Sequence, residues 1–418
     1  MKKTVIQKGK VLEYVKIKNN EPRAYWKYSY EKFSKEGLKN RDSCLFSGIF
    51  RYKVKEFMIK KFKKVNSLKK PVQLTLELGK DLFPLVDALK GAYLLERITE
   101  MRKNISNDLG LEIPKIRIID NMNLSSSEYC IKIYGIEKGK SIIKLGHCLC
   151  INPDTVKKKN IGEKTNEPAF GLPALWISED NWDKAIKSGY TVADHPGIII
   201  THLSKIIRYN IYELLNRQNT QTIIDNLKKH HQIVVDEVLL SKNGKNLTLG
   251  QIKVILQGLL KEQVSIKNMV TIMETIADSL YFSIDSRFHI ERVRQALANQ
   301  LCHQYADKNQ TLHVLTLDKS LELKIIDSKY SDSFGNILSV MESPLYKAWI
   351  KALKNSVSVV KDKGYTPLIL CSSQARYLAR NALYREFPDI AVLSVPEIAE
   401  NYNVKSIGVI TLEQEQNN

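Results

Sequence analysis

The sequence has no apolar run long enough to cross a membrane. Nowhere in its 418 residues does a stretch approach the ~18 consecutive apolar residues of a transmembrane helix. Met1, Lys2 and Lys3 lead into polar sequence instead of the apolar stretch of a signal peptide. We therefore expect a chain that is soluble or peripheral to a membrane and has no transmembrane segment.

Cysteine is scarce, and its spacing does not suit a metal site. None of the six cysteines forms a C-x-x-C pair, and Cys148 with Cys150 has no second pair to complete a tetrahedral site. Scattered cysteines in a long chain without a signal peptide indicate reduced thiols in a cytoplasm. We predict no metal ligands.

Motifs for nucleotide binding and catalysis are also missing. The sequence has no phosphate-binding glycine loop, no G-x-S-x-G and no H-E-x-x-H. Asp194, His195 and Ser204 have the residue types of a catalytic triad, but chance explains them better because types alone give no geometry. His230 and His231 fit the end of a helix, where they complement its dipole. We predict that the protein is not an enzyme and needs no cofactor.

Acidic residues are scarce at one end of the chain. Residues 1–70 hold 21 Lys and Arg against 6 Asp and Glu, so +15 of the net charge of +19 lies there. Only +4 is left for the other 348 residues. Such asymmetry indicates a tail that meets an acidic partner, either nucleic acid or anionic lipid.

This basic leader also carries many aromatic residues. Aromatic side chains between cations can stack on bases or lie among lipid headgroups. Residues 52–64 place Val54, Phe57, Met58 and Phe62 among lysines, the pattern of a basic amphipathic helix on a membrane surface. Three interpretations stay open for residues 1–71: contact with an anionic membrane, binding of nucleic acid, and a Lys-rich leader with no dedicated ligand.

After the leader the pattern becomes regular. Apolar residues alternate over residues 72–78, which predicts a half-buried strand. A helix is expected to start near Pro84 and to end at Gly110, followed by strands at 116–118 and 129–133. These elements predict a helix packed on a sheet.

The second half of the chain is expected to be helical first and mixed later. Asp194 caps a helix with Pro196 in its first turn, and Thr248 with Gln251 fits a capping box. Residues 218–293 are predicted to be almost wholly helical. A second α/β layer should follow, with strands at 312–317, 368–371, 391–393 and 404–410 and helices at 345–360 and 374–387.

One loop has the composition of a rigid support for an aromatic residue. Pro168 and Pro173 fix their own φ angles and push the residues before them to extended geometry. Such a loop would hold Phe170 in one place, and loops on a rigid scaffold often carry function. On residue type alone, a core aromatic between two strands is the simpler interpretation.

The stretch around Phe170 closely resembles the cytoplasmic domain of the FlhA/SctV (InvA-type) export-gate family of flagellar and virulence type III secretion systems. Similar segments follow in the family's order from about residue 72 to about residue 410, whereas the first 70 residues do not match. These segments are 76–79 (LELG), 82–87 (LFPLVD), 213–218 (ELLNRQ), 264–269 (VSIKNM), 271–274 (TIME), 293–297 (VRQAL) and 388–394 (PDIAVLS).

The resemblance implies an α+β and α/β fold of four subdomains. The first is a discontinuous α/β subdomain, the second a small α+β subdomain inserted into it, the third helical and the fourth α/β. The expected ranges are 1–71 for the leader, 72–145 and 195–214 for the first subdomain, 146–194 for the second, 215–294 for the third and 295–413 for the fourth.

The resemblance also implies a cytoplasmic export-gate domain at the inner-membrane face of the secretion apparatus. Family members form a ring, typically nonameric, work with other export-apparatus proteins, and receive chaperone–substrate complexes whose export they help to order. The docking groove lies between the first two subdomains, and its key positions match Glu167, Phe170 and Thr201. The flagellar branch often has Asp where this chain has Glu167. Full-length members carry an amino-terminal block of transmembrane helices, which is not found in this sequence.

A second class of function fits the same sequence. A shortened, retargeted gate-like protein would bind nucleic acid or an anionic membrane through its basic leader. Binding to nucleic acid should fall steeply with salt because phosphate contacts release counterions, whereas docking on Phe170 should not. The sequence does not decide between flagellar and virulence use.

Overall fold

The computed structural model describes residues 2–7, 10–15, 72–87, 93–151, 162–240, 246–331 and 337–412. The chain forms two compact units, residues 1–71 and 72–418. In the first unit, β1 (Lys2–Gln7) and β2 (Lys10–Val15) pair as an antiparallel hairpin, which the sequence pattern did not predict. The amphipathic helix expected over residues 52–64, with its contacts to lipid or nucleic acid, lies outside the described residues.

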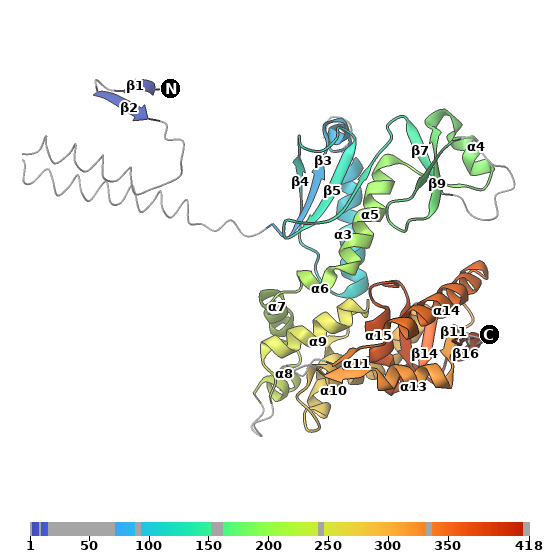
Figure 1. The fold of residues 1–418 in the computed structure, drawn as a ribbon. Helices are drawn as coiled ribbons and strands as arrows, with labels where there is room; N and C mark the ends of the chain where they lie inside the picture. The colour runs from blue at the N-terminus through green and yellow to red at the C-terminus, as the bar shows by residue number, and fades with distance from the viewer. Residues whose placement is uncertain are drawn as a thin grey trace, which may run out of the picture. The chain divides into compact units, whose positions relative to one another are not determined.

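The first sheet of the second unit mixes parallel and antiparallel pairing. Its strand order is β4 (Ile116–Asp120), β3 (Leu74–Leu78), β5 (Glu128–Ile133) and β6 (Ile136–Ile142). The predicted strands 72–78, 116–118 and 129–133 are confirmed, and the alternating leucines of β3 are buried. Two helices in mutual contact, α3 (Tyr93–Leu109) and α5 (His195–Tyr209), share the core of this sheet (Figure 1).

The helix expected to start near Pro84 does not start there. Pro84 lies inside a short 3₁₀ helix, η1 (Lys80–Leu85), and the described part of α3 begins at Tyr93. The backbone N–H of Asp81 donates to the carbonyl of Ser126 at 2.8 Å, which ties this segment to the loop before β5. This tertiary contact, which no local pattern encodes, favours a tight turn at Pro84 over the first turn of an α-helix.

The predicted helix ends are largely confirmed. Gly110 adopts φ +77° directly after α3, the left-handed conformation that stops a helix. Asp194 caps α5 by accepting a hydrogen bond of 2.9 Å from the N–H of Gly197. Thr248 and Gln251 form the expected capping box at the start of α9 (Leu249–Lys261).

A second sheet lies in sequence between β6 and α5. Its order is β10 (Thr191–Ala193), β7 (His147–Ile151), β9 (Pro173–Ser178) and β8 (Glu163–Asn166), with every pair antiparallel. Between β9 and β10 the chain forms η3 (Glu179–Asn181) and α4 (Trp182–Lys187). This layer has a small core of its own, formed by Cys148, Cys150, Ile177, Ala185 and Tyr190.

The described residues between 211 and 305 are mostly helical, as predicted for most of this range. The remaining helices here are α6 (Ile211–Leu214), α7 (Arg217–Lys228), α8 (Gln232–Leu239), α10 (Met269–Ser279), α11 (Ser286–Ala296) and α12 (Ala298–Tyr305). Their buried faces belong to the same core as the first sheet, so α3, α5 and these helices are joined by continuous apolar packing.

The last sheet is parallel. Its order is β15 (Ala391–Ser394), β14 (Leu368–Cys371), β11 (Thr311–Leu317) and β16 (Asn403–Ile410). The other elements of this region are α13 (Lys319–Asp327), β12 (Lys329–Ser331), β13 (Ile337–Ser339), α14 (Ser343–Asp362), α15 (Ser373–Leu383) and η4 (Val395–Glu397). All four predicted strands are confirmed, while the β12–β13 hairpin was missed.

Helix α15 is shorter than predicted. It ends at Leu383 instead of Phe387, and residues 384–386 form a turn. Within the described ranges, no helix combines the length and apolarity needed to cross a bilayer. The mixed α/β character is as expected, and the division into four subdomains stays a prediction.

Candidate functional site

The turn between β8 and β9 is held by a buried carboxylate. Glu167 accepts hydrogen bonds from the backbone N–H groups of Ala169, at 2.8 Å, and Phe170, at 2.6 Å. The N–H of Glu167 closes the turn by donating to the carbonyl of Leu172 at 2.8 Å. Gly171 has φ +68°, which glycine adopts without strain. The backbone around Phe170 is therefore fixed.

Phe170 projects from this turn instead of entering the core. Its side chain is 54% exposed, so its interpretation as a core aromatic between two strands is wrong. Glu167 is only 3% exposed, and its carboxylate is used by the turn itself. The acid that the family resemblance places at the site thus shapes the loop, while Phe170 is free to make contacts.

A groove of about 640 Å³ runs along α3 and α5 beside Phe170. It brings together two of the three predicted site residues, Phe170 and Thr201, whereas Glu167 does not line it. The hydroxyl of Thr201 donates to the carbonyl of Gly197 at 2.8 Å and can still accept a hydrogen bond. The lining residues are Arg97, Glu100, Met101, Asn104, Ile105, Phe170, Gly197, Ile200, Thr201, Ser204, Lys205, Arg208, Tyr209 and Gln263.

Lys205 is a residue of this groove that the sequence pattern missed. Its Nζ lies 4.6 Å from the ring centroid of Phe170 and 5.3 Å from that of Tyr209, both within cation–π range. The same Nζ lies 4.0 Å from Oδ2 of Asp389. Its position one turn after Thr201 on α5 was a signal that could have identified it.

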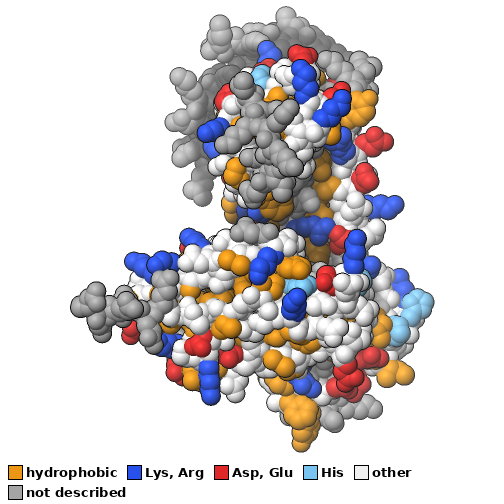
Figure 2. Space-filling view, turned by 90° about the vertical axis from the view of Figure 1, so that its right-hand side faces the viewer, with side chains coloured by type: hydrophobic (Ala, Val, Ile, Leu, Met, Phe, Trp, Pro, Cys, Tyr) orange, Lys and Arg blue, Asp and Glu red, His pale blue; other side chains and the backbone are white. Residues whose placement is uncertain are grey.

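Two further cations line the groove, and each is held by an acid. Arg97 Nη1 lies 2.7 Å from Asp194 Oδ1, and this hydrogen bond raises the pKa of Arg97. Arg208 forms a hydrogen-bonded ion pair with Asp108. Charges of both signs are interspersed on the face shown in Figure 2, which agrees with the small net charge of residues 71–418. A charged ligand in the groove would thus contact individual ion pairs and not a broad electrostatic field of one sign.

A buried polar pair lies on the core side of α5. Tyr129 Oη and His202 Nδ1 are 2.9 Å apart. Burial lowers the pKa of His202, with the charge of Lys205 in the same direction and that of Glu167 opposing it. A Cβ at Gly139 would lie 2.9 Å from His202 Nε2, so glycine there permits β6 to approach α5 closely. This pair helps to position the helix that carries Thr201 and Lys205.

Residues considered for catalysis or for metal binding have structural partners. Asp194 caps α5 and binds Arg97, and His195 Nε2 lies 2.7 Å from the carbonyl of His147. Cys148 and Cys150 have their sulfur atoms 3.9 Å apart, and burial raises the pKa of Cys150 to about 12. Asp194, His195 and the two cysteines are thus engaged by the fold.

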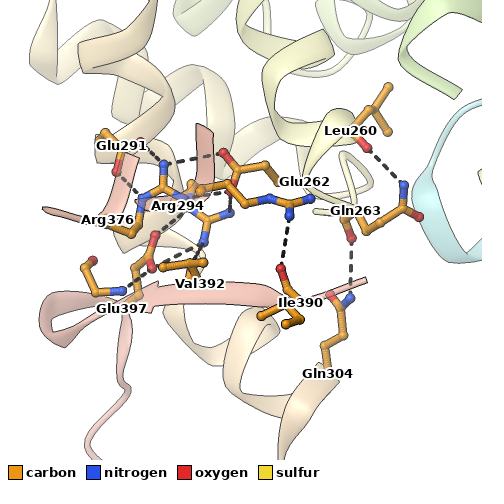
Figure 3. A network of polar contacts seen from close by, with 12 residues as sticks. Leu260, Glu262, Gln263, Glu291, Arg294, Gln304, Arg376, Ile390, Val392 and Glu397 are labelled. Atoms are coloured by element: carbon orange, nitrogen blue, oxygen red, sulfur yellow. Dashed lines mark hydrogen bonds and ion pairs between the residues drawn. The ribbon is translucent and has the colours of Figure 1, made fainter. Parts of the chain in front are cut away.

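A second polar cluster, also missed from the sequence, joins α9, α11, α15 and η4 (Figure 3). Arg294 Nε lies 2.5 Å from Glu397 Oε1, and Arg376 Nε lies 2.6 Å from Glu291 Oε2. Glu262 accepts from both arginines, at 3.1 Å from Arg294 and 2.7 Å from Arg376. Burial alone would raise the pKa of Glu262, but the charges of Arg376 and Arg294 outweigh it and hold the pKa at about 2.

This cluster is connected to the groove through the next residue. Gln263, which adopts φ +59°, donates from its amide to the carbonyl of Arg208 at 2.6 Å. Gln263 itself lines the groove. The carboxyl end of α5 is therefore tied to the buried charges that join the helical region to the last sheet.

Comparison with known proteins identifies the family. A profile of the FHIPEP family matches residues 31–403. The chain therefore belongs to the FHIPEP family of flagellar and type III protein export, which confirms the resemblance to FlhA and SctV. The match begins at residue 31, so the expectation that the first 70 residues lie outside the family is wrong for 31–70. This match also argues against the alternative hypothesis, in which the basic leader was acquired to bind nucleic acid or an anionic membrane.

Curated relatives of this chain include flagellar proteins named FlhA. Flagellar biosynthesis protein FlhA of Treponema pallidum is 43% identical over 345 residues, which cover 82% of this chain and 48% of that protein. Flagellar biosynthesis protein FlhA of Bacillus subtilis is 39% identical over 339 residues, covering 81% and 49%. The chain spans about half the length of the curated relatives it matches.

Solved structures share the fold. The Chlamydia pneumoniae CdsV protein matches with a TM-score of 0.72 at 24% identity, covering 83% of this chain and 99% of that one. Nonameric EPEC SctV-C, solved by cryo-EM, matches with a TM-score of 0.64 at 20% identity, covering 82% and 100%. These similarities confirm the mixed α/β fold class.

Proposed function

We propose that this chain is the cytoplasmic domain of an export gate, located at the inner-membrane face of a type III secretion apparatus. In this role its groove docks chaperone–substrate complexes and helps to order their export. The observation that supports this most is the exposure of Phe170 on a turn fixed by Glu167 beside the groove. Aromatic side chains that fill a partner's pocket often dominate the energy of an interface.

The groove has the lining that an amphipathic helix requires. Half-buried Ile200 supplies apolar surface on α5, and Phe170 adds an exposed ring, over a floor of buried Met101 and Ile105. Helices bind such grooves with apolar residues spaced three and four apart. Thr201, on the same wall, offers a polar contact at the edge. The groove thus matches an apolar helical face of a chaperone or of its bound substrate.

We extend the proposal to assembly. One neighbour by fold is nonameric, and another was solved as a complex of CdsV and CdsO. By analogy, this chain forms a ring of about nine copies and contacts other export-apparatus proteins. Its four-subdomain organisation, with the second sheet as an inserted subdomain, belongs to the same proposal.

The docking function is tested by removing the Phe170 ring. Phe170→Ala should weaken binding of a chaperone–substrate complex by about 1–2 kcal/mol, measured by calorimetric titration. Phe282→Ala is the matched control, because Phe282 is also exposed but lies in the loop between α10 and α11. Unchanged affinity in a folded Phe170→Ala protein would refute docking at this groove.

A further inference from the structure

Lys205 lies between the exposed aromatic of the groove and an acid from the last sheet region. Its Nζ is 4.6 Å from the ring centroid of Phe170 and 4.0 Å from Oδ2 of Asp389. The Lys205 side chain is 20% exposed, whereas that of Asp389 is 55% exposed. The ammonium group is thus partly shielded and reachable from the groove, which it lines.

The ion pair of Lys205 is looser than those of the other groove cations. Arg97 is hydrogen-bonded to Asp194 at 2.7 Å, and Arg208 is hydrogen-bonded to Asp108. The 4.0 Å between Lys205 and Asp389 exceeds hydrogen-bond distance. Lys205 can therefore bind a carboxylate of a ligand without breaking a hydrogen bond to Asp389.

The loop that presents Asp389 is anchored independently of Lys205. Arg380 donates to the carbonyls of Pro388, at 3.2 Å, and Ile390, at 3.1 Å. Figure 3 shows the contact at Ile390, beside the buried cluster around Glu262. Because both neighbours of Asp389 are held in this way, its carboxylate can release Lys205 while the loop keeps its place.

We propose, building on the docking function above, that Lys205 determines the specificity of the groove. The occupant is an amphipathic helix that carries a carboxylate beside its apolar face. Its apolar residues cover Phe170 and Ile200, and its carboxylate replaces Asp389 at Lys205. Asp389 is then an internal competitor that occupies the lysine in the free protein. An occupant without the acid would leave the Asp389 pair in place and gain no ionic contact.

The test uses synthetic amphipathic peptides of about 18 residues, five helical turns, with a Leu/Met face. Three versions differ only in one residue beside that face: Glu, Gln or Lys. Binding to the full chain is measured by fluorescence anisotropy at several salt concentrations. The Glu peptide should bind about three- to tenfold more tightly than the Gln peptide at low salt, and this preference should shrink as salt screens the pair.

Variants of the protein test whether Lys205 causes the preference for the Glu peptide. Lys205→Gln should abolish it, and Lys205→Glu should reverse it toward the Lys peptide. Asp389→Asn should tighten binding of the Glu peptide alone, because the competing carboxylate is gone. Lys103→Gln is the matched control: it removes one charge from the exposed side of α3, outside the groove, and should leave the preference unchanged.

The outcomes separate this inference from the docking function. If all peptides bind with equal affinity and Phe170→Ala weakens them, docking stands and the role of Lys205 is overturned. A preference that survives Lys205→Gln also overturns it. If no peptide binds while a chaperone–substrate complex does so through Phe170, the acidic helix is the wrong occupant. If neither the peptides nor the complex binds, the docking function fails together with the inference.

Discussion

The carboxylate of Glu167 accepts a hydrogen bond of 2.6 Å from the backbone N–H of Phe170. A second bond, from Ala169 at 2.8 Å, uses the other oxygen. Glu167 is buried, and its carboxylate holds the backbone of Phe170 in position. A site residue identified by family resemblance can thus act through its neighbour.

Glu167→Ala should therefore damage docking without removing any contact surface. Two backbone N–H groups would lose their acceptor, which costs about 1–3 kcal/mol when such groups remain buried. We expect affinity for a chaperone–substrate complex to fall toward that of Phe170→Ala, with a lower midpoint in urea unfolding. Glu167→Asp should keep most of the affinity, because a shorter carboxylate can still cap nearby N–H groups. Wild-type affinity in Glu167→Ala would show that the turn is rigid without the acid.

The charge cluster gives a prediction for stability. Arg294→Met would leave Glu397, which is fully buried, without its closest ionic partner and should destabilise the protein by about 3–5 kcal/mol. Arg294→Met combined with Glu397→Gln should cost less than the single change, because the unpaired charge is gone. Urea unfolding measures both. The matched control is Lys228→Met, which breaks a half-buried pair with Asp236 and should lower the midpoint much less than Arg294→Met.

Local features of this fold could be predicted from the sequence. The Thr248–Gln251 capping box and the Asp194 cap need only residues three positions apart, and the alternating strand of residues 72–78 needs only its own pattern. The structure confirms these local predictions because no tertiary contact opposes them. Pro84 shows the opposite case, since a contact with a distant loop decides its conformation.

The site itself needed more than local pattern. Composition predicted a rigid loop at Phe170. The exposure of the Phe170 side chain depends on where the turn between β8 and β9 lies relative to the groove. Glu262 and Arg376 are 114 positions apart in the sequence, and Lys205 and Asp389 are 184 positions apart. No periodicity links such residues. They become neighbours only when α5, the helical region and the last sheet pack together.

Buried His202 should make stability depend on pH. Burial lowers its pKa below the ordinary value of 6.5, so the unfolded chain takes up this proton at a higher pH than the folded one. The contribution of neutral His202 to the free energy of unfolding is fully present above about pH 6.5. It is lost as the pH falls from there toward the pKa of His202 in the folded protein. The slope from one such group is at most about 1.4 kcal/mol per pH unit.

His202→Gln should remove this part of the pH dependence. Urea unfolding between pH 5 and 7.5 would show a shallower loss of stability in the variant than in the wild type. His303→Gln is the control, because His303 is exposed on α12 and should keep the wild-type slope. An unchanged slope in His202→Gln would mean that His202 is protonated equally in the folded and unfolded states.

The ring proposal predicts a mass. If this chain assembles like its nonameric neighbour by fold, light scattering of the full chain at high concentration should give about nine times 47.9 kDa, with rings visible by electron microscopy. Residues 72–418 form a unit with a core of their own, so this shorter chain can be compared directly. Rings from both chains would place the assembly contacts in residues 72–418. Rings from the full chain alone would make the leader part of the contact, and monomers from both would contradict self-assembly of this chain.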